Sequence, residues 1–376
     1  MKLFTSEAVG QGHPDIIADT ISDSILDLCL SKNRNARVAA ETLVVGNKAI
    51  VAGEISGAEI TNGEMYNTIL EVVENNHSEG MRDFTPEKFE VEILFRQQSQ
   101  DIAMGVDTGG AGDQGLMFGF SCNYNEDMLP TPIFLARRVA NWLTTKNPLS
   151  VLGIYKDVKT QFTLEYDEQT KTFGRVRNVV CSIHHGTEWD MNQLRTVLKK
   201  NIISLVHGLY PEGNIEELEP ERWHLNATGA FTIGGPDADT GLTGRKLIAG
   251  TYGGFAHHGG GALSGKDPSK VDRSAALYLR WLANRIVREE KLANLIELQV
   301  GYAIGVAEPM SVSLIQVDMP ENTSKIEEFL MSQDYTPNGM IEQLSLKDQR
   351  YSQAAMYGHF GKQPNGSVYT WENVNV

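Results

Sequence analysis

Three stretches of this chain each combine β-rich segments with one amphipathic helix, and this alternation most constrains the fold. The first stretch opens with a predicted helix at about 14–30, whose isoleucines recur at helical spacing. The second and third stretches have predicted helices at about 191–207 and 271–289. Because 376 residues are too many for one ordinary core, the pattern predicts several α/β units.

Strand candidates accompany these helices. A turn-prone Gly46-Asn47 pair separates predicted strands at 38–45 and 49–55. Further strands are predicted at 89–95, 116–120, 161–166, 175–184, 245–252, 296–306 and 310–317. We therefore expect an α/β fold with units at 1–104, 105–233 and 234–376, although the sequence shows no obvious repeat.

Charge and composition limit the kinds of partner that the protein can bind. A formal net charge of -15 argues against nucleic acid as the main partner, because a binding face would have to overcome the field of the whole chain. No apolar run reaches membrane-spanning length, and no long apolar stretch follows Lys2 as in a secretory signal. The three widely spaced cysteines fit reduced thiols. We expect a cytoplasmic protein, bound to neither membrane nor nucleic acid.

A local basic segment at 245–273 interrupts this acidic background. It holds five Lys and Arg residues against two aspartates, with two histidines besides. Within it, residues 260–267 nearly match a P-loop, but Asp267 replaces the magnesium-binding hydroxyl and a proline delays the next helix. The segment is either a seat for a small polyanion, contacted by Lys266 and Lys270, or a glycine turn with solvated lysines.

A second glycine-rich segment, at 110–115, formally satisfies the dinucleotide-binding pattern. Residues 116–120 continue as a strand rather than a helix, which argues against that fold. We interpret the segment as a turn that presents Asp113. Asp239, Phe231 and Lys159 are weaker candidates, each of which a purely structural role would also explain.

The sequence at 13–15, His-Pro-Asp, directly precedes the first predicted helix. Carboxylates are stabilised near helix N-termini, so Asp15 could simply complement the helix dipole. In that case Asp19, Asp23 and Asp27 would form a solvated stripe. A histidine beside an aspartate would equally suit a phosphate contact and a magnesium ligand, so both interpretations stay open.

Taken in order, four of these segments resemble signatures of the S-adenosylmethionine synthetase family. They are residues 12–15 (GHPD), 110–115 (GAGDQG), 241–246 (GLTGRK) and 258–274 (HGGGALSGKDPSKVDRS). The resemblance extends along nearly the whole chain. It implies three similar α/β domains around a pseudo-threefold axis, assembled as a homodimer or homotetramer with the active site at the dimer interface.

The resemblance also implies a reaction between ATP and methionine. The methionine sulfur displaces the triphosphate at C5′, and the triphosphate is then cleaved to phosphate and pyrophosphate. A neutral thioether needs no general base, so catalysis would rest on positioning and on neutralising the leaving triphosphate.

Site residues follow from the resemblance by position. The implied triphosphate contacts are His13, Lys159, Arg245, Lys246, Lys266 and Lys270. The implied nucleotide pocket adds Asp157, Ala262, Ile304 and the adenine-stacking Phe231. The implied methionine contacts are Glu54, Gln98, Asp113, Asp239 and Lys270. The implied cation ligands are Asp15 and Asp272 for magnesium and Glu41 for potassium.

Three positions depart from the family pattern. Ile16 replaces a usual lysine, and Ala230 replaces a usual arginine. Only Thr108-Gly109 separates residues 105–107 from Gly110, where the family has a longer gating loop. Two other functions compete with the implied one. One is a magnesium-dependent phosphotransferase or tripolyphosphatase, and the other is a non-catalytic regulatory subunit that binds nucleotide. The presence of all the matched lysines and aspartates argues against the second.

Overall fold

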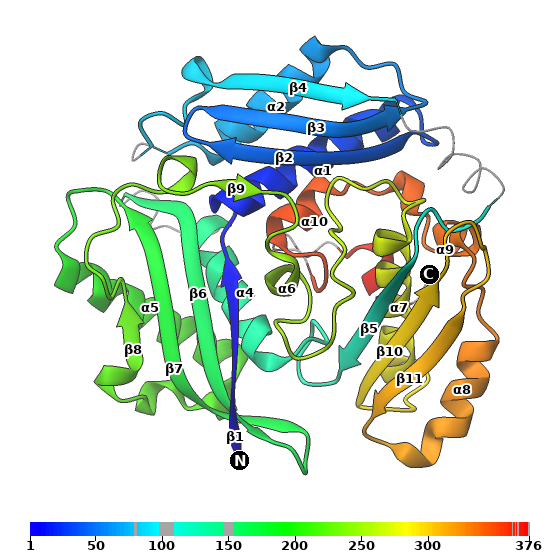
Figure 1. Cartoon of the computed structure of the whole chain (residues 1–376). Helices are drawn as coiled ribbons and strands as arrows, with labels where there is room; N and C mark the ends of the chain where they lie inside the picture. The colour runs from blue at the N-terminus through cyan, green and yellow to red at the C-terminus, as the bar shows by residue number, and fades with distance from the viewer. Residues whose placement is uncertain are drawn as a thin grey trace.

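The protein is described by a computed structural model that covers residues 1–78, 81–97, 109–145, 153–362, 364, 366 and 368–374. Its strands form three sheets around long central helices (Figure 1). The first sheet has the order β4 (Glu90–Arg96), β3 (Lys48–Ser56), β2 (Arg37–Val45) and β9 (Gly241–Leu242). The central sheet has the order β1 (Lys2–Val9), β6 (Ile154–Asp167), β7 (Thr172–His185) and β8 (Trp223–Leu225). The third sheet has the order β11 (Ser311–Val317), β10 (Leu295–Tyr302) and β5 (Gly115–Cys122).

One long helix packs on each sheet. These helices are α1 (Pro14–Lys32) on the first sheet, α4 (Thr131–Thr145) on the central sheet and α7 (Val271–Arg288) on the third. The other α-helices are α2 (Asn62–Asn76), α5 (Met191–Leu209), α6 (Leu247–Gly250), α8 (Thr323–Met331), α9 (Pro337–Gln343) and α10 (Ser352–Tyr357). Short 3-10 helices are η1 (Pro86–Lys88), η3 (Pro211–Gly213), η4 (Ile215–Glu217), η5 (Pro220–Arg222), η6 (Gly235–Asp237), η7 (Pro320–Asn322), η8 (Leu346–Asp348) and η9 (Thr370–Glu372). The predicted α/β fold of three units is confirmed.

Each sheet also contains a strand from another part of the chain. β1 pairs antiparallel with β6 along its whole length, from Lys2 opposite Tyr166 to Val9 opposite Lys159. β5 pairs with β10, and the short β9 pairs with β2. The colours of β1, β5 and β9 in Figure 1 differ from those of the sheets that they join. Strand sharing therefore connects the three units.

Local sequence explains where the long helices begin. Pro14 lies in the first turn of α1, and His13 is the N-cap, whose Nδ1 accepts a hydrogen bond from Asp15 N at 3.2 Å. α2 begins with a capping box formed by Thr61 and Glu64. The helices predicted at 14–30, 191–207 and 271–289 are confirmed by α1, α5 and α7. Among the described residues, no helix is both long enough and apolar enough to cross a membrane.

The strand predicted at 245–252 is wrong. Leu247–Gly250 instead forms the single helical turn α6, in which Gly250 N donates to Lys246 O at 2.8 Å. The apolar run is short and glycines bound it, so its residue pattern does not distinguish a strand from a turn. α6 packs against β1, and the helical turn satisfies its backbone groups locally.

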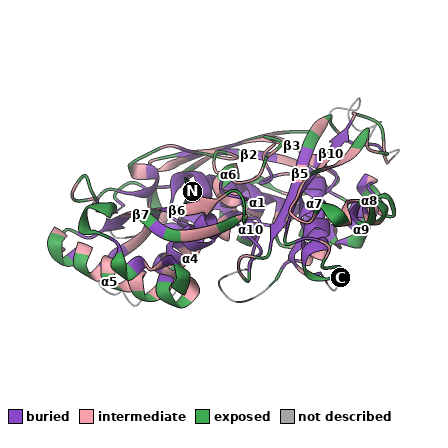
Figure 2. Cartoon of the chain, turned by 90° about the horizontal axis from the view of Figure 1, so that it is seen from below, coloured by how far each residue is buried: buried purple, intermediate pink, exposed green. Residues whose placement is uncertain are grey.

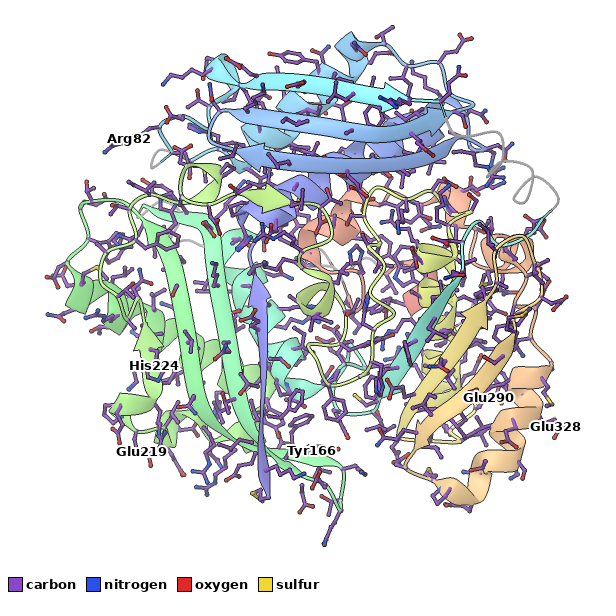
Figure 3. The ribbon with its side chains drawn as sticks, in the orientation of Figure 1. Arg82, Tyr166, Glu219, His224, Glu290 and Glu328 are labelled. Carbon is purple, nitrogen blue, oxygen red and sulfur yellow. The ribbon has the colours of Figure 1, made fainter. Side chains whose placement is uncertain are left out.

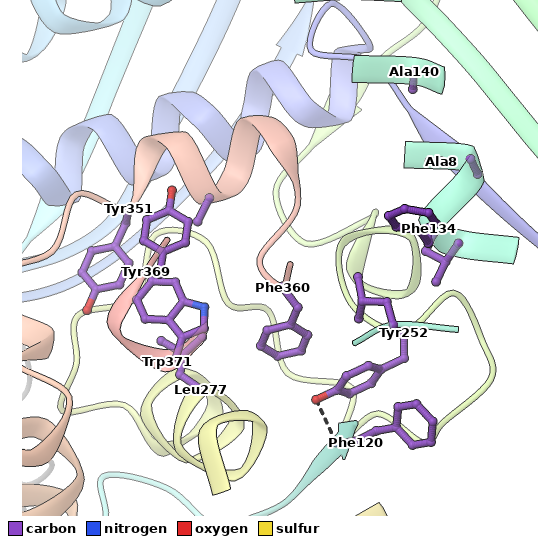
Figure 4. Close-up of a cluster of buried hydrophobic side chains, with 14 of the residues drawn as sticks. Ala8, Phe120, Phe134, Ala140, Tyr252, Leu277, Tyr351, Phe360, Tyr369 and Trp371 are labelled. Carbon is purple, nitrogen blue, oxygen red and sulfur yellow. Dashed lines mark hydrogen bonds between the residues drawn. The ribbon is translucent and has the colours of Figure 1, made fainter. Parts of the chain in front are cut away.

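The core continues from the sheets to the C-terminal segment. In Figure 4, Tyr369 and Trp371 stack with ring centroids 4.4 Å apart, and Phe120 N donates to Tyr252 Oη at 3.0 Å. α7 is buried on nearly all sides, whereas α5 exposes one face (Figure 2). The periodicity of the sequence predicts α7 as a helix but does not indicate the second covered face.

Candidate active site

Charged residues gather at the N-terminus of α1 and form what we call the first cluster. It consists of His13, Asp15, Asp157, Lys159, Asp239, Arg245 and Lys246. Asp15 is buried, and its Oδ2 lies 2.5 Å from Lys246 Nζ. Its Oδ1 accepts a hydrogen bond from Leu242 N at 2.9 Å and lies 3.5 Å from Arg245 Nε. Asp15 is thus paired with cations and does more than complement the helix dipole.

His13 is buried beside Asp15 and is neutral in this environment. Burial, followed by the charges of Lys246 and Lys159, lowers the pKa of His13 to about 3. Because its Nδ1 accepts the Asp15 N–H, the proton of the neutral ring is on Nε2. His13 can therefore donate one hydrogen bond from Nε2 to an anion.

Strand β6 brings Asp157 and Lys159 to the same place. Asp157 is buried and accepts a hydrogen bond from Gly235 N at 2.8 Å, and burial raises its pKa to about 6. The Lys159 side chain is exposed, as is Asp239, and both charges act on the His13 pKa. The structure therefore assembles residues from α1, β6 and the segment at 239–246.

Asp237, two residues before Asp239, has a structural role. Its carboxylate accepts hydrogen bonds from the backbone amides of Arg82, Asp83 and Phe84. This contact lies where the first and central sheets approach each other, near the labelled Arg82 (Figure 3). Asp237 thereby fixes the turn that presents Asp239.

Phe231 lies beside the two histidines at the end of β7. Its backbone N donates to His185 Nε2 at 3.0 Å, and its backbone O accepts from His185 N at 2.9 Å. Its ring is half-buried, with its centroid 5.5 Å from that of His184. A ring fixed at the backbone and open on one side can stack on a planar base.

The second cluster consists of Ala262, Lys266, Lys270 and Asp272. Lys266 Nζ lies 2.5 Å from Asp272 Oδ2, and Lys270 Nζ lies 3.7 Å from Asp267 Oδ2. The lysine side chains are only 24% and 17% exposed, so the solvated-lysine interpretation is wrong. A Cβ at Gly261 would lie 2.4 Å from Asp272 Cγ, which explains the glycine beside this carboxylate.

The other predicted site residues lie on or near the open sheet faces. Glu41 is exposed on β2 and Glu54 is half-buried on β3. Asp113 is exposed two residues before Gly115, where a Cβ would lie 3.7 Å from Asp272 Oδ1. Ile304 is 58% exposed in the loop after β10. Gln98 and most of the shortened loop lie outside the described residues.

The sequence does not indicate the contacts of the α1 aspartates. Asp19 accepts a hydrogen bond from Gly244 N at 2.8 Å, and Asp23 accepts one from Gly265 N at 2.7 Å. Asp23 also forms a buried ion pair with Arg273 at 2.7 Å. The solvated-stripe interpretation is therefore wrong. The sequence shows only the regular four-residue spacing of these aspartates. Solvated and buried acidic faces share this spacing, so it does not distinguish them.

A divalent cation would need ligands beyond the protein. Within the described ranges, no group of three or more His, Cys, Asp and Glu side chains is close enough to hold a metal ion. Magnesium commonly binds one or two carboxylates and completes its shell with substrate phosphates and water. Asp15 and Asp272 fit this kind of site, each with carboxylate oxygens beside a displaceable lysine.

Comparison with known proteins gives consistent matches along the chain. The N-terminal, central and C-terminal domain models of S-adenosylmethionine synthetase match residues 1–100, 108–231 and 233–373. A relative named S-adenosylmethionine synthase, from Pelagibacter ubique (strain HTCC1062), is 40% identical over 383 residues, covering 99% of this chain and 96% of the relative. The structure of an unusual S-adenosylmethionine synthetase from Campylobacter jejuni aligns with a TM-score of 0.88 and 31% identity, covering 100% of this chain and 97% of that one.

Proposed function

The chain belongs to the S-adenosylmethionine synthetase family and synthesises S-adenosylmethionine from ATP and methionine, and we propose that its first and second clusters together bind the triphosphate. The observation that carries the proposal is that each cluster contains a lysine paired with an aspartate at the same distance. Lys246 lies 2.5 Å from Asp15, and Lys266 lies 2.5 Å from Asp272. Each pair places a cation and a carboxylate together, as a magnesium-bound triphosphate requires.

The chemistry explains why these groups suit the reaction. The bond between the methionine sulfur and C5′ forms as the C5′–O bond breaks, and the bonding electron pair leaves with the triphosphate. The sulfur becomes a sulfonium, and negative charge grows on the leaving oxygen. Fixed cations next to that oxygen stabilise the transition state more than the ground state. His13 supports this arrangement as a neutral Nε2–H donor, and Lys159, Arg245 and Lys270 supply further positive charge.

The remaining site residues are assigned to the adenine ring and to methionine. Phe231 stacks on adenine in this proposal, with Asp157, Ala262 and Ile304 nearby. The methionine contacts are Glu54, Gln98, Asp113, Asp239 and Lys270. Exposed carboxylates at Asp113 and Asp239 support this assignment, because they suit the ammonium group of methionine.

Two cations belong to the proposed site. Asp15 and Asp272 would hold magnesium together with phosphate oxygens of ATP, which would release Lys246 and Lys266 toward the triphosphate. The chemistry that magnesium would supply there is neutralisation of the charge on the leaving triphosphate. Glu41, exposed on the open face of β2, is the proposed potassium ligand.

We also propose a homodimer in which the second cluster of one copy meets the first cluster of its partner. Large apolar side chains on the outer strands support this arrangement. Leu94 on β4 is 52% exposed, Leu116 on β5 is 52% exposed and Ile315 on β11 is 42% exposed. An interface between two copies would remove such apolar side chains from water. A homotetramer would contain two such dimers, and the cytoplasmic location stays a prediction.

The substrate dependence of triphosphate loss tests the function. The full chain is incubated with ATP and magnesium, with and without methionine, and the products are identified by mass. Loss of the triphosphate only with methionine, together with one equivalent of S-adenosylmethionine, is the expected result. Equal ATP cleavage without methionine would favour a phosphotransferase or tripolyphosphatase. Nucleotide binding without any product would favour a regulatory subunit.

A further inference from the structure

Helix α1 contacts the segment that carries Arg245 and Lys246 and also the segment that carries Lys266. Four aspartates on it are spaced by four residues, so they lie on one face about one turn apart. Each carboxylate accepts a hydrogen bond from a backbone amide elsewhere in the chain. The donors are Leu242 N to Asp15, Gly244 N to Asp19, Gly265 N to Asp23, and Tyr351 N and Ser352 N to Asp27.

The bonds of Asp19 and Asp23 are placed directly next to proposed triphosphate contacts. Gly244 immediately precedes Arg245 and Lys246, and Gly265 immediately precedes Lys266. Two consecutive anchors on one rigid helix thus hold each segment, and the cations that follow it, in place. We propose that Asp19 is a positioning residue for adenosyl transfer, and that it acts by holding the Gly244 amide.

The surroundings of Gly244 show that it has one well-defined position. Its φ is 81°, a left-handed conformation that favours glycine, and a Cβ there would lie 2.8 Å from Ala262 Cβ. The segments of the two clusters therefore touch at this point. Thr243 is fixed as well, because its Oγ1 accepts from Thr42 N at 2.9 Å.

The contacts of Asp19 distinguish its role from that of its neighbours on the helix. Its side chain is buried, and within the described part of the chain no cation lies within ion-pair distance of it. Asp15 instead pairs with Lys246, and Asp23 pairs with the buried Arg273. Asp19 contributes an acceptor for one amide, and it does not neutralise a substrate-binding cation. Its removal should displace Arg245 and Lys246 without leaving a buried positive charge.

The test compares two aspartates that make the same kind of bond from the same helix. Asp19→Ala removes the acceptor for Gly244, and Asp27→Ala removes the acceptor for Tyr351 and Ser352, outside both clusters. We expect Asp19→Ala to lower kcat by roughly tenfold or more, since small displacements of catalytic groups are costly. Asp27→Ala should lower the melting temperature comparably and leave kcat within about twofold. Asp19→Asn keeps an acceptor oxygen and should recover most of the lost kcat.

Three results would overturn the proposal: an unchanged kcat in Asp19→Ala, an equal loss of kcat in Asp27→Ala, or no recovery in Asp19→Asn. If Asp19→Ala does not fold, Gly244→Ala tests whether displacement of this segment affects turnover: the backbone N–H stays, but the new Cβ would lie 2.8 Å from Ala262 Cβ. It should lower kcat, and an unchanged kcat would also contradict the proposal. The inference rests on the proposed function, whose failure is distinguishable because the unmodified chain would then form no S-adenosylmethionine.

Discussion

At the residue scale, Asp15 offers a direct test of the magnesium assignment. Asp15→Asn removes the negative charge but keeps the size and the acceptor for Leu242 N. We expect the magnesium concentration for half-maximal activity to rise by roughly tenfold, because an amide is a poorer magnesium ligand than a carboxylate. Activity is titrated with magnesium at saturating ATP and methionine. An unchanged titration with a small stability loss would contradict the magnesium assignment and leave Asp15 a structural role, at the helix N-terminus and as the partner of Lys246.

Lys266 separates transition-state stabilisation from substrate binding. The charge that Lys266 meets grows as the triphosphate leaves, so Lys266→Ala should lower kcat by roughly a hundredfold and change the methionine KM much less. Steady-state kinetics at saturating ATP measures both constants. Lys200→Ala, on the exposed face of α5, is the control and should leave both unchanged. A variant of Lys266 with full kcat and a raised methionine KM would contradict the triphosphate assignment.

His184 gives the protein a predictable pH dependence. Burial lowers its pKa to about 4, while an unfolded chain has the ordinary histidine value near 6.5. The unfolded state therefore binds more protons between these values, so the histidine favours unfolding as pH falls from about 6.5 to 4, by up to about 1.4 kcal/mol per pH unit. Urea unfolding of the chain and of His184→Phe across this window should show a weaker pH dependence in the variant. Parallel pH dependences would contradict this account.

The same residues show what the sequence can and cannot predict at this scale. Pro14 and the residue type at position 15 indicate a carboxylate at a helix start. Its partner Lys246 is 231 residues away, and no local pattern indicates that contact. Asp23 and Asp27 have the same spacing as Asp15, yet the sequence does not distinguish their burial. Residue roles are predictable from motifs, whereas contacts depend on the assembled fold.

At the element scale, the buried pair of Arg280 and Glu372 joins α7 to the C-terminal segment. Arg280 Nε lies 2.9 Å from Glu372 Oε1, and Gly361 N donates to the same oxygen at 2.9 Å. Glu372→Ala should lower the free energy of unfolding by about 3–5 kcal/mol, because it leaves a buried guanidinium unpaired. The control, Glu289→Ala, removes a partly exposed partner of Arg285 and should cost less than about 1 kcal/mol.

Urea unfolding of both variants measures the difference. Similar small losses in the two would show that Glu372 does not compensate the Arg280 charge. The predicted loss depends on the burial of Arg280. Arg280 is buried because the C-terminal segment covers the outer face of α7. No helical periodicity indicates that cover.

Elements with strong periodicity were predictable, and elements decided by tertiary context were not. α1, α5 and α7 have regular apolar spacing, and the β2–β3 hairpin has a glycine turn with Gly46 at a φ of 51°. Residues 245–252 combine a short apolar run with glycines, and tertiary packing against β1 favours a helical turn there. The shortened loop before Gly110 lies mostly outside the described residues, and its role as a gating loop stays a prediction.

At the scale of the whole molecule, strand sharing limits what any local pattern can predict. β1 lies in the first unit of the sequence but pairs with β6 of the central sheet, and β9 joins β2 from nearly 200 residues away. Strand pairing of this kind depends on which sheet edge is open after folding. The boundaries near 105 and 234 stay predictions. They divide the sequence into consecutive units, whereas each sheet combines strands from different units.

The central claim is that adenosyl transfer takes place where the first cluster of one copy meets the second cluster of its partner. Asp15→Ala and Lys266→Ala each inactivate one cluster, and the two variant proteins are mixed, dissociated and reassembled. Half of the dimers are then hybrid, and each hybrid contains one site with both clusters intact. S-adenosylmethionine formation should recover to about a quarter of the wild-type rate. A mixture no more active than the two variants measured separately would contradict the shared site.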